Sequence, residues 1–274
     1  MIFHFFFPKA KKNFQKWTKI FVQFSFFFLR IEKKYYVFLI YSMEKKLTTE
    51  LLSLNDKLLI DNSFYITYVF LMTTATITFI EAIRTKDEKV RHILNLETCI
   101  SVVAAFFYSK FVENVEKNPE TDYEKLNKMR YTDWSITTPI MLLVLVLAFL
   151  YNSKGGSLPF SKFLLILFFN FGMLGMGYLG ELNVLSKLTA NGLGFGFFAA
   201  LYGYIYQQFL YKQYNFDNLI LYLAFFVLWA FYGVAYFFNE VNKNVVYNVL
   251  DLFSKCFVGI FFWAYFTKTF TLRT

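Results

Sequence analysis

The chain contains seven apolar segments, each close to the length that a helix needs to cross a lipid bilayer, about 20 residues. Its composition is 57% hydrophobic and 23% aromatic, which leaves too little polar surface for a soluble globule. We therefore expect an all-α, polytopic membrane protein built as a bundle of seven transmembrane helices. The segments cover residues 63–83, 93–112, 129–151, 160–182, 188–210, 219–238 and 245–267.

Residues 1–42 form a basic tract rich in Phe and Lys that is too short of apolar residues to provide a span. The longest apolar run in this tract, residues 20–29, covers about half of the length of a transmembrane helix. A small-residue cleavage site is missing, so a cleaved signal peptide is not expected. Since Met43 opens a more ordinary sequence, we interpret residues 1–42 as an N-terminal extension and residues 43–274 as the helical domain.

The net charge of +9 is concentrated in the N-terminal tract and in the connections between segments. Anchoring to anionic lipid explains this distribution better than nucleic-acid binding does. Residues 84–92 carry four Lys or Arg, whereas residues 113–128 are mostly acidic. The positive-inside rule then predicts an outside N-terminus and a cytoplasmic C-terminus, although a translated basic tract at 1–42 argues against it.

The last apolar segment contains a lysine, Lys255, with Asp251 four residues earlier on the same helical face. An ammonium group buried in a membrane costs several kcal/mol, so it is expected to be paired, chemically modified or close to water. Two interpretations follow from these residues. Lys255 forms a structural ion pair between helices, or its amine has condensed with an aldehyde to a Schiff base that a carboxylate keeps protonated.

A second carboxylate lies in the third segment, within the sequence RYTDWSITTP. Arg130, Asp133 and Thr137 recur at helical spacings of three and four, so one stripe carries a guanidinium, a carboxylate and a hydroxyl group. That stripe must face the interior of the bundle. The two cysteines, Cys99 and Cys256, lie in different apolar segments, and no metal site is expected.

The motifs R-Y-x-D-W-x-x-T-T-P and D-x-x-x-K, in this order on seven spans, resemble those of the microbial (type 1) rhodopsins. The resemblance covers about residues 60–268. It implies all-trans retinal bound covalently to Lys255 as a protonated Schiff base, with Asp133 and Asp251 as counter-ions. One carboxylate about 4 Å from a cation contributes about 4 kcal/mol at an effective dielectric constant near 20. Arg130 is expected to offset the excess negative charge and to keep Asp133 ionised.

The same resemblance implies the residues of a retinal pocket. Trp134 and Trp229 would sandwich the polyene, Tyr232 would donate a hydrogen bond to Asp251, and the apolar Met141 would favour green absorption. An aromatic stripe without the lysine would more often be ordinary core. The residues that we expect to contact retinal are Lys255, Trp134, Thr138, Met141, Trp229, Tyr232 and Tyr236.

The usual cytoplasmic proton donor is missing, because the position eleven residues after Asp133 is Val144. Glu97, about one turn inside the second segment, is the candidate replacement, since a carboxylate within a membrane is functional by default. The alternative is a snorkelling or helix-pairing residue.

Glu97 together with Glu81, Arg91 and Trp263 resembles the viral branch of the family, found in large DNA viruses of protists. In that branch the helix-two glutamate is the proposed donor, and polar residues near the cytoplasmic ends meet between subunits of a ring. The resemblance implies a homo-oligomer, a pentamer or a trimer, in a host-cell membrane. For Glu81, Arg91 and Trp263 the alternative is ordinary interfacial anchoring.

Three functions fit these residues, and none of them is enzymatic. An outward proton pump ranks first, because Asp133 and Thr137 keep the pump arrangement. A light-gated cation channel ranks second and needs a hydrated polar path, for which Glu97, Asn248 and the threonines Thr73, Thr74 and Thr76 are the candidates. A photosensory receptor ranks third.

Overall fold

The computed structural model describes residues 33–117, 122–211 and 214–267, with side chains described at 55 and from 57 onward. The chain divides into two compact units, Met1–Asp56 and Lys57–Thr274. In the first unit the described backbone is helical from Lys33 onward, as the beginning of helix α2 (Lys33–Arg84). Residues 1–32 of the predicted extension 1–42 lie outside the described part of the chain.

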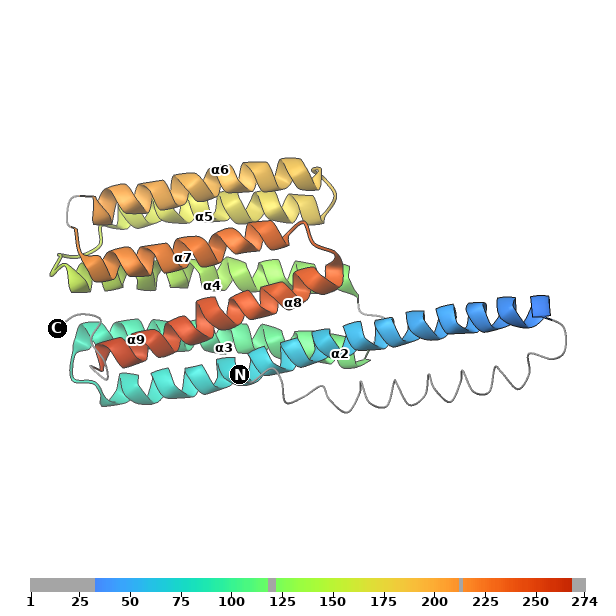
Figure 1. Ribbon diagram of the computed structural model, residues 1–274. Coiled ribbons are helices and arrows are strands. Elements are labelled where there is room, and N and C mark those ends of the chain that lie inside the picture. Colours follow the sequence, from blue (N-terminus) through green and yellow to red (C-terminus); the bar gives the residue numbers. More distant parts are fainter. Residues whose placement is uncertain (1–32, 118–121, 212–213, 268–274) are drawn as a thin grey trace. The chain divides into compact units, whose positions relative to one another are not determined.

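The second unit contains seven helices, two of which include a π-helical turn (Figure 1). The prediction of an all-α bundle is therefore confirmed, and the described ranges contain no strand. After α2 the helices are α3 (Glu88–Lys117), α4 (Tyr123–Asn152), α5 (Phe160–Glu181), α6 (Lys187–Ile205) continued by η1 (Tyr206–Leu210), α7 (Phe216–Ala235), and α8 (Glu240–Asp251) continued by η2 (Leu252–Phe257) and α9 (Val258–Phe266).

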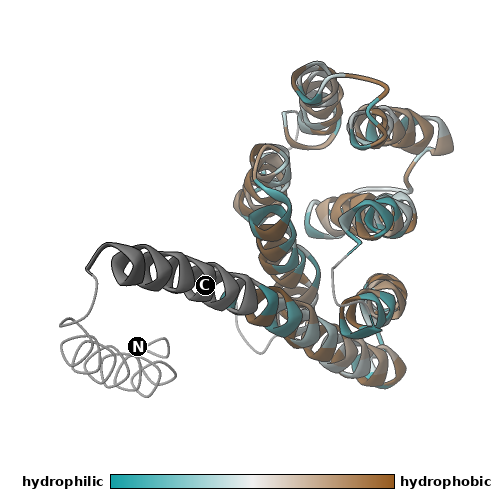
Figure 2. Cartoon of the chain, turned by 90° about the vertical axis from the view of Figure 1, so that its right-hand side faces the viewer, coloured by the Kyte–Doolittle hydropathy of each residue, from teal (hydrophilic) through white to brown (hydrophobic). Residues whose placement is uncertain are grey.

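Six helices in the described part are long and apolar enough to cross a membrane. The helix formed by α6 and η1 coincides with the predicted segment 188–210. Hydrophobic residues occur along every helix of the second unit (Figure 2), which fits a multi-pass integral membrane protein.

The connections are shorter than the sequence suggested. Residues 84–92 and 113–128 were expected to be connections, but α3 begins at Glu88 and ends at Lys117, and α4 begins at Tyr123. Side-chain caps fix several of these helix starts. Asp122 accepts a hydrogen bond from the Lys125 backbone N–H, and Asn239 accepts one from Asn242. Polar caps therefore extend the helices beyond their apolar segments.

The largest apolar cluster fills the half of the bundle that contains the C-terminal part of α4. Ile93, Val144, Leu145, Phe149 and Phe262 belong to it, and each is at most 1% exposed. The position predicted to lack a proton donor, Val144, is therefore part of a closely packed apolar layer.

An ion-pair cluster ties together the other ends of α4, α5 and α8. The ammonium of Lys243 lies 3.0 Å and 3.2 Å from the two carboxylate oxygens of Glu181 and 3.0 Å from Glu240 Oε1. The Asn127 amide donates to both carboxylates at 3.0 Å. Since the Lys243 side chain is fully buried and that of Glu181 is 8% exposed, these charges depend on one another for stabilisation.

We expect Lys243→Met to lower the free energy of unfolding by about 3 kcal/mol, because it leaves the buried Glu181 carboxylate without its cation. Thermal and denaturant unfolding of the purified protein, followed by circular dichroism, measures this. The matched control is Lys187→Met. Lys187 is 46% exposed and lies 3.7 Å from Glu240, so its loss should cost less than about 1 kcal/mol. Equal effects of the two variants would contradict the assignment.

Candidate functional site

The Lys255 side chain lies buried between two carboxylates from different helices. Its Nζ is 2.7 Å from Asp133 Oδ2 on α4 and 3.2 Å from Asp251 Oδ2 at the end of α8. Lys255 is 2% exposed and both aspartates are 0% exposed. The amine and both carboxylates that the sequence singled out therefore meet at one point, where charge attraction is stronger than in water.

Lys255 lies within the π-helical turn η2, which separates α8 from α9. A π-turn inserts one extra residue per turn, and such turns are frequent at functional sites. The lysine thus projects toward α4 from a part of the helix where the regular backbone hydrogen bonding is interrupted.

Two tyrosines hold the Asp251 carboxylate. Tyr232 on α7 donates to Oδ1 at 2.6 Å, as the resemblance implied, and the Tyr108 hydroxyl on α3 lies 2.9 Å from Oδ2. Ser254 is within 2.9 Å of the Tyr232 hydroxyl. Both oxygens of Asp251 therefore already accept hydrogen bonds. In contrast, Asp133 Oδ1 has no hydrogen-bond partner among the described residues.

Arg130 is buried in this site, on the same side of the lysine as Asp251. Its guanidinium lies 3.8 Å from Asp251 Oδ2. Among the described residues, Asp251 is the carboxylate within ion-pair distance of Arg130. It also donates to Asn248 at 2.7 Å and to Asn244 at 3.1 Å. Arg130 is therefore held in the site by residues of α8. Its positive charge and that of Lys255 together equal the negative charge of the two carboxylates.

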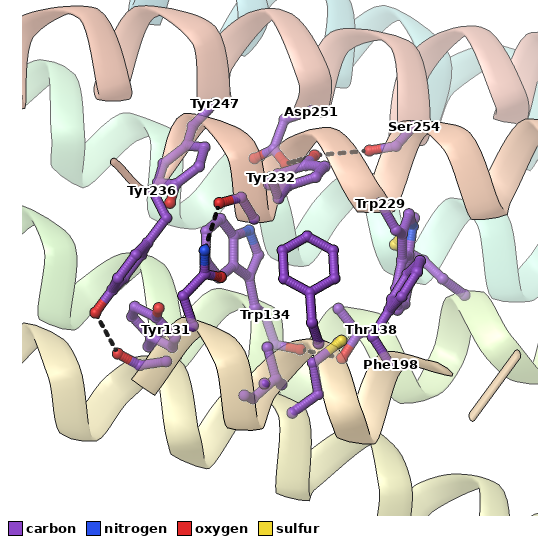
Figure 3. A pocket seen from close by; sticks show the side chains of 18 of the residues that line it. Tyr131, Trp134, Thr138, Phe198, Trp229, Tyr232, Tyr236, Tyr247, Asp251 and Ser254 are labelled. Atoms are coloured by element: carbon purple, nitrogen blue, oxygen red, sulfur yellow. Dashed lines mark hydrogen bonds between the residues drawn. The ribbon is translucent and has the colours of Figure 1, made fainter. Parts of the chain in front are cut away.

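An aromatic cavity adjoins Lys255 and Asp251 (Figure 3). Every other residue expected to contact retinal lines it: Trp134, Thr138, Met141, Trp229, Tyr232 and Tyr236. Gly177 and Gly233 also line it, where a larger side chain would narrow the space. The Lys255 amine lies at a wall of a mostly apolar cavity, and this arrangement fits a long conjugated aldehyde such as retinal.

The threonines of the third segment support α4 rather than the carboxylate. Thr137, buried as expected, donates to the Asp133 backbone carbonyl at 2.9 Å, and Thr138 donates to that of Trp134 at 2.7 Å. The Asn170 amide on α5 in turn donates to Thr138 Oγ1 at 2.9 Å. These bonds fix the backbone that carries Asp133 and Trp134.

Glu97 faces inward and is 2% exposed, with no ion pair or hydrogen bond of its carboxylate to another described residue. Arg91 is exposed and donates to the Thr85 carbonyl. Of the threonines proposed for a polar path only Thr74 is buried. Thr73 and Thr76 are exposed and bond to their own helix, so that part of the prediction is wrong.

The three residues expected at a subunit interface come to the same end of the bundle. Glu81 pairs with Arg84 at 3.7 Å, and Trp263 packs against a small cluster that includes Ala82 and Val90. Glu81, Arg91 and Trp263 therefore all have local contacts within this chain.

Sequence reasoning missed several residues of the site. Tyr108 and Asn244 were not singled out, and Asn248 was assigned only to a channel path. A signal existed for the asparagines, since Asn244, Asn248 and Asp251 recur at spacings of four and three on one helical face. Tyr108 had no such signal, because the chain contains 20 tyrosines.

The fold and this site define a helical membrane protein with a buried lysine, two carboxylates and an aromatic cavity at its centre. Comparison with known proteins agrees: a family model described as bacteriorhodopsin-like protein matches residues 59–269. The chain belongs to this family, the microbial rhodopsins, whose members bind retinal, lie in membranes and include light-driven ion transporters.

Among solved structures, the viral rhodopsin OLPVRII shares 58% sequence identity with the chain, with a TM-score of 0.73, and the match covers 78% of this chain and 100% of that one. A blue light-absorbing proteorhodopsin from Med12 is 22% identical (TM-score 0.60, covering 75% of this chain and 94% of that one). Xanthorhodopsin, a light-driven ion pump with dual chromophore, is 18% identical (TM-score 0.63, covering 76% and 92%). The last two show the common fold alone. A search of curated proteins found no match.

Proposed function

We propose that this rhodopsin is an outward light-driven proton pump in which Lys255 holds all-trans retinal covalently. The observation that carries the proposal is the contact of the Lys255 nitrogen with Asp133, 2.7 Å long and fully buried. Retinal, when bound, would supply light absorption and a light-driven change of shape. Trp134, Trp229, Met141 and Tyr236 would hold it in the cavity.

Asp133 is the proton acceptor. It is the nearer of the two carboxylates to the lysine nitrogen, within hydrogen-bond reach. Its Oδ1 carries free acceptor capacity among the described residues, whereas the oxygens of Asp251 are already engaged by Tyr232 and Tyr108. Asp251 therefore serves as the permanent counter-ion, and Arg130 stabilises it from the other side.

Glu97 returns the proton from the opposite half of the bundle. Its carboxylate is buried and has no cation to keep it ionised, so it is suited to hold a proton until the lysine nitrogen needs one. Val144, at the position of the usual donor, belongs to the apolar layer and carries no carboxylic acid, so another residue has to take this role.

Glu97→Gln should slow recovery of the visible absorption band after a flash by about a hundredfold, because an amide cannot give up a proton to the lysine nitrogen. The initial loss of the band, which depends on Asp133, should keep its rate. Flash spectroscopy of the purified protein measures both. The control is Glu124→Gln, at an exposed residue of α4 outside the site. Unchanged recovery would remove Glu97 from the mechanism.

Voltage-clamped photocurrents test the function as a whole. A pump drives outward current at all voltages, whereas the alternative, a light-gated cation channel, gives a current that reverses with the ionic gradient. The closely packed apolar layer and the outward-facing Thr73 and Thr76 support the pump. A reversing current would reject it.

The proposal also covers the limits of the domain, its orientation in the membrane and its oligomeric state. We propose that residues 43–274 form the retinal-binding domain, with the N-terminus outside and the C-terminus in the cytoplasm. We also propose a homo-oligomer, a pentamer or trimer, in which Glu81, Arg91 and Trp263 approach a neighbouring subunit near the cytoplasmic side. Their common location at one end of the bundle supports this arrangement.

A further inference from the structure

Gly259 lies where α9 meets the carboxylate of Glu97. A Cβ atom added at Gly259 would be 3.0 Å from Glu97 Oε2 and 2.8 Å from the Thr74 methyl group. These distances are shorter than ordinary van der Waals contacts, so even an alanine would force its neighbours to move. Gly259 follows Lys255 by four residues, about one helical turn along the same helix.

Because Gly259 has no side chain, the Glu97 carboxylate has room to lie against the α9 backbone. Glu97 comes from α3 and lies against the α9 backbone, on the same helix as the lysine nitrogen that it would supply. Thr74 on α2 closes the space from a third side, and its β-branched side chain has little rotational freedom. Glu97, with a long flexible side chain, is the group that would yield.

A second polar side chain lies on the same face of α3 as the Glu97 carboxyl group. Ser101 lies one turn after Glu97 on the same face of α3, and its hydroxyl is buried without a hydrogen-bond partner among the described residues. Ser101 and Glu97 thus share a small polar patch next to an apolar cluster that includes Ile100.

We propose that Gly259 is a positioning residue: it lets the Glu97 carboxylate reach the α9 backbone one turn from Lys255, and so sets the rate at which the proton returns. This inference rests on the proposed donor role of Glu97. A displacement of about 1 Å of a reacting group can cost up to about a hundredfold in rate, so the position of the carboxylate matters as much as its presence.

The test is Gly259→Ala in the full chain with retinal bound. We expect recovery of the visible band after a flash to slow by roughly tenfold or more, while the band position and its initial loss stay unchanged. Azide, a small weak acid that can carry protons into the protein, should restore the rate. Gly203→Ala is the matched control, because a Cβ at this helical glycine meets nothing within 4 Å.

A second variant separates the two close contacts of Gly259. Thr74→Ser removes the methyl group that an added Cβ would meet at 2.8 Å, so Gly259→Ala combined with Thr74→Ser isolates the contact with Glu97. It also protects the test if Gly259→Ala alone folds poorly. Recovery in the pair should remain slow relative to Thr74→Ser alone.

A double-mutant comparison distinguishes failure of this inference from failure of the proposed function. If Gly259 acts through Glu97, adding Gly259→Ala to Glu97→Gln causes no further slowing. Slowing by the same factor in both backgrounds, or recovery as fast as in Gly203→Ala, would overturn the positioning role. Normal recovery in Glu97→Gln would instead overturn the donor itself.

Discussion

Lys255→Ala, expressed and purified in the presence of retinal, will show no visible absorption band and no light-driven current. Among the described residues that line the cavity, Lys255 is the one with an amine that can form an imine with an aldehyde, and the variant removes this amine. Absorption spectra of the purified variant and the wild type measure this. Circular dichroism verifies that the variant is still helical.

Lys255→Arg is the matched variant for the competing interpretation, a purely structural ion pair. Arginine keeps a cation close to Asp133 and Asp251 but forms no stable imine with retinal. It should therefore be more stable than Lys255→Ala and equally colourless. A visible band in either variant would mean that the pigment is held elsewhere.

Asp133→Asn should reduce the light-driven outward current at least a hundredfold, because the amide cannot accept the proton that leaves the lysine nitrogen. Photocurrents normalised to the amount of pigment measure the effect. The control is Asp122→Asn on the same helix: Asp122 caps α4, and asparagine caps helices equally well. Wild-type current in Asp133→Asn would show that the acceptor lies elsewhere.

The fold and the centre of the site could be predicted from the sequence, because both depend on short-range patterns. Apolar segments of about 20 residues identify spanning helices, and the spacing of Asp251 and Lys255 places them on one helical face. The inward position of Asp133 follows from its stripe with Arg130 and Thr137.

The contacts that the sequence did not reveal join helices that are distant in the chain. Arg130 has a long side chain and could reach either aspartate, and the position of Asn244 and Asn248 on α8 decides in favour of Asp251. The Lys243 cluster needs α4, α5 and α8 together, and the spacing of Glu240 and Lys243 on one helix indicates only one of its contacts. The π-turns likewise cannot be predicted from a pattern that assumes 3.6 residues per turn.

The π-turn η2 also decides which way the residues after it point. A π-helix turns through a smaller angle per residue than an α-helix, so if Leu252–Phe257 formed regular α-helix, everything after them would be rotated by about 100° relative to α8. Lys255 would then turn away from Asp133, and Gly259 would turn away from Glu97, although no side chain of the site had been replaced. The wide turn therefore sets the orientation of one helix toward two carboxylates that come from two other helices.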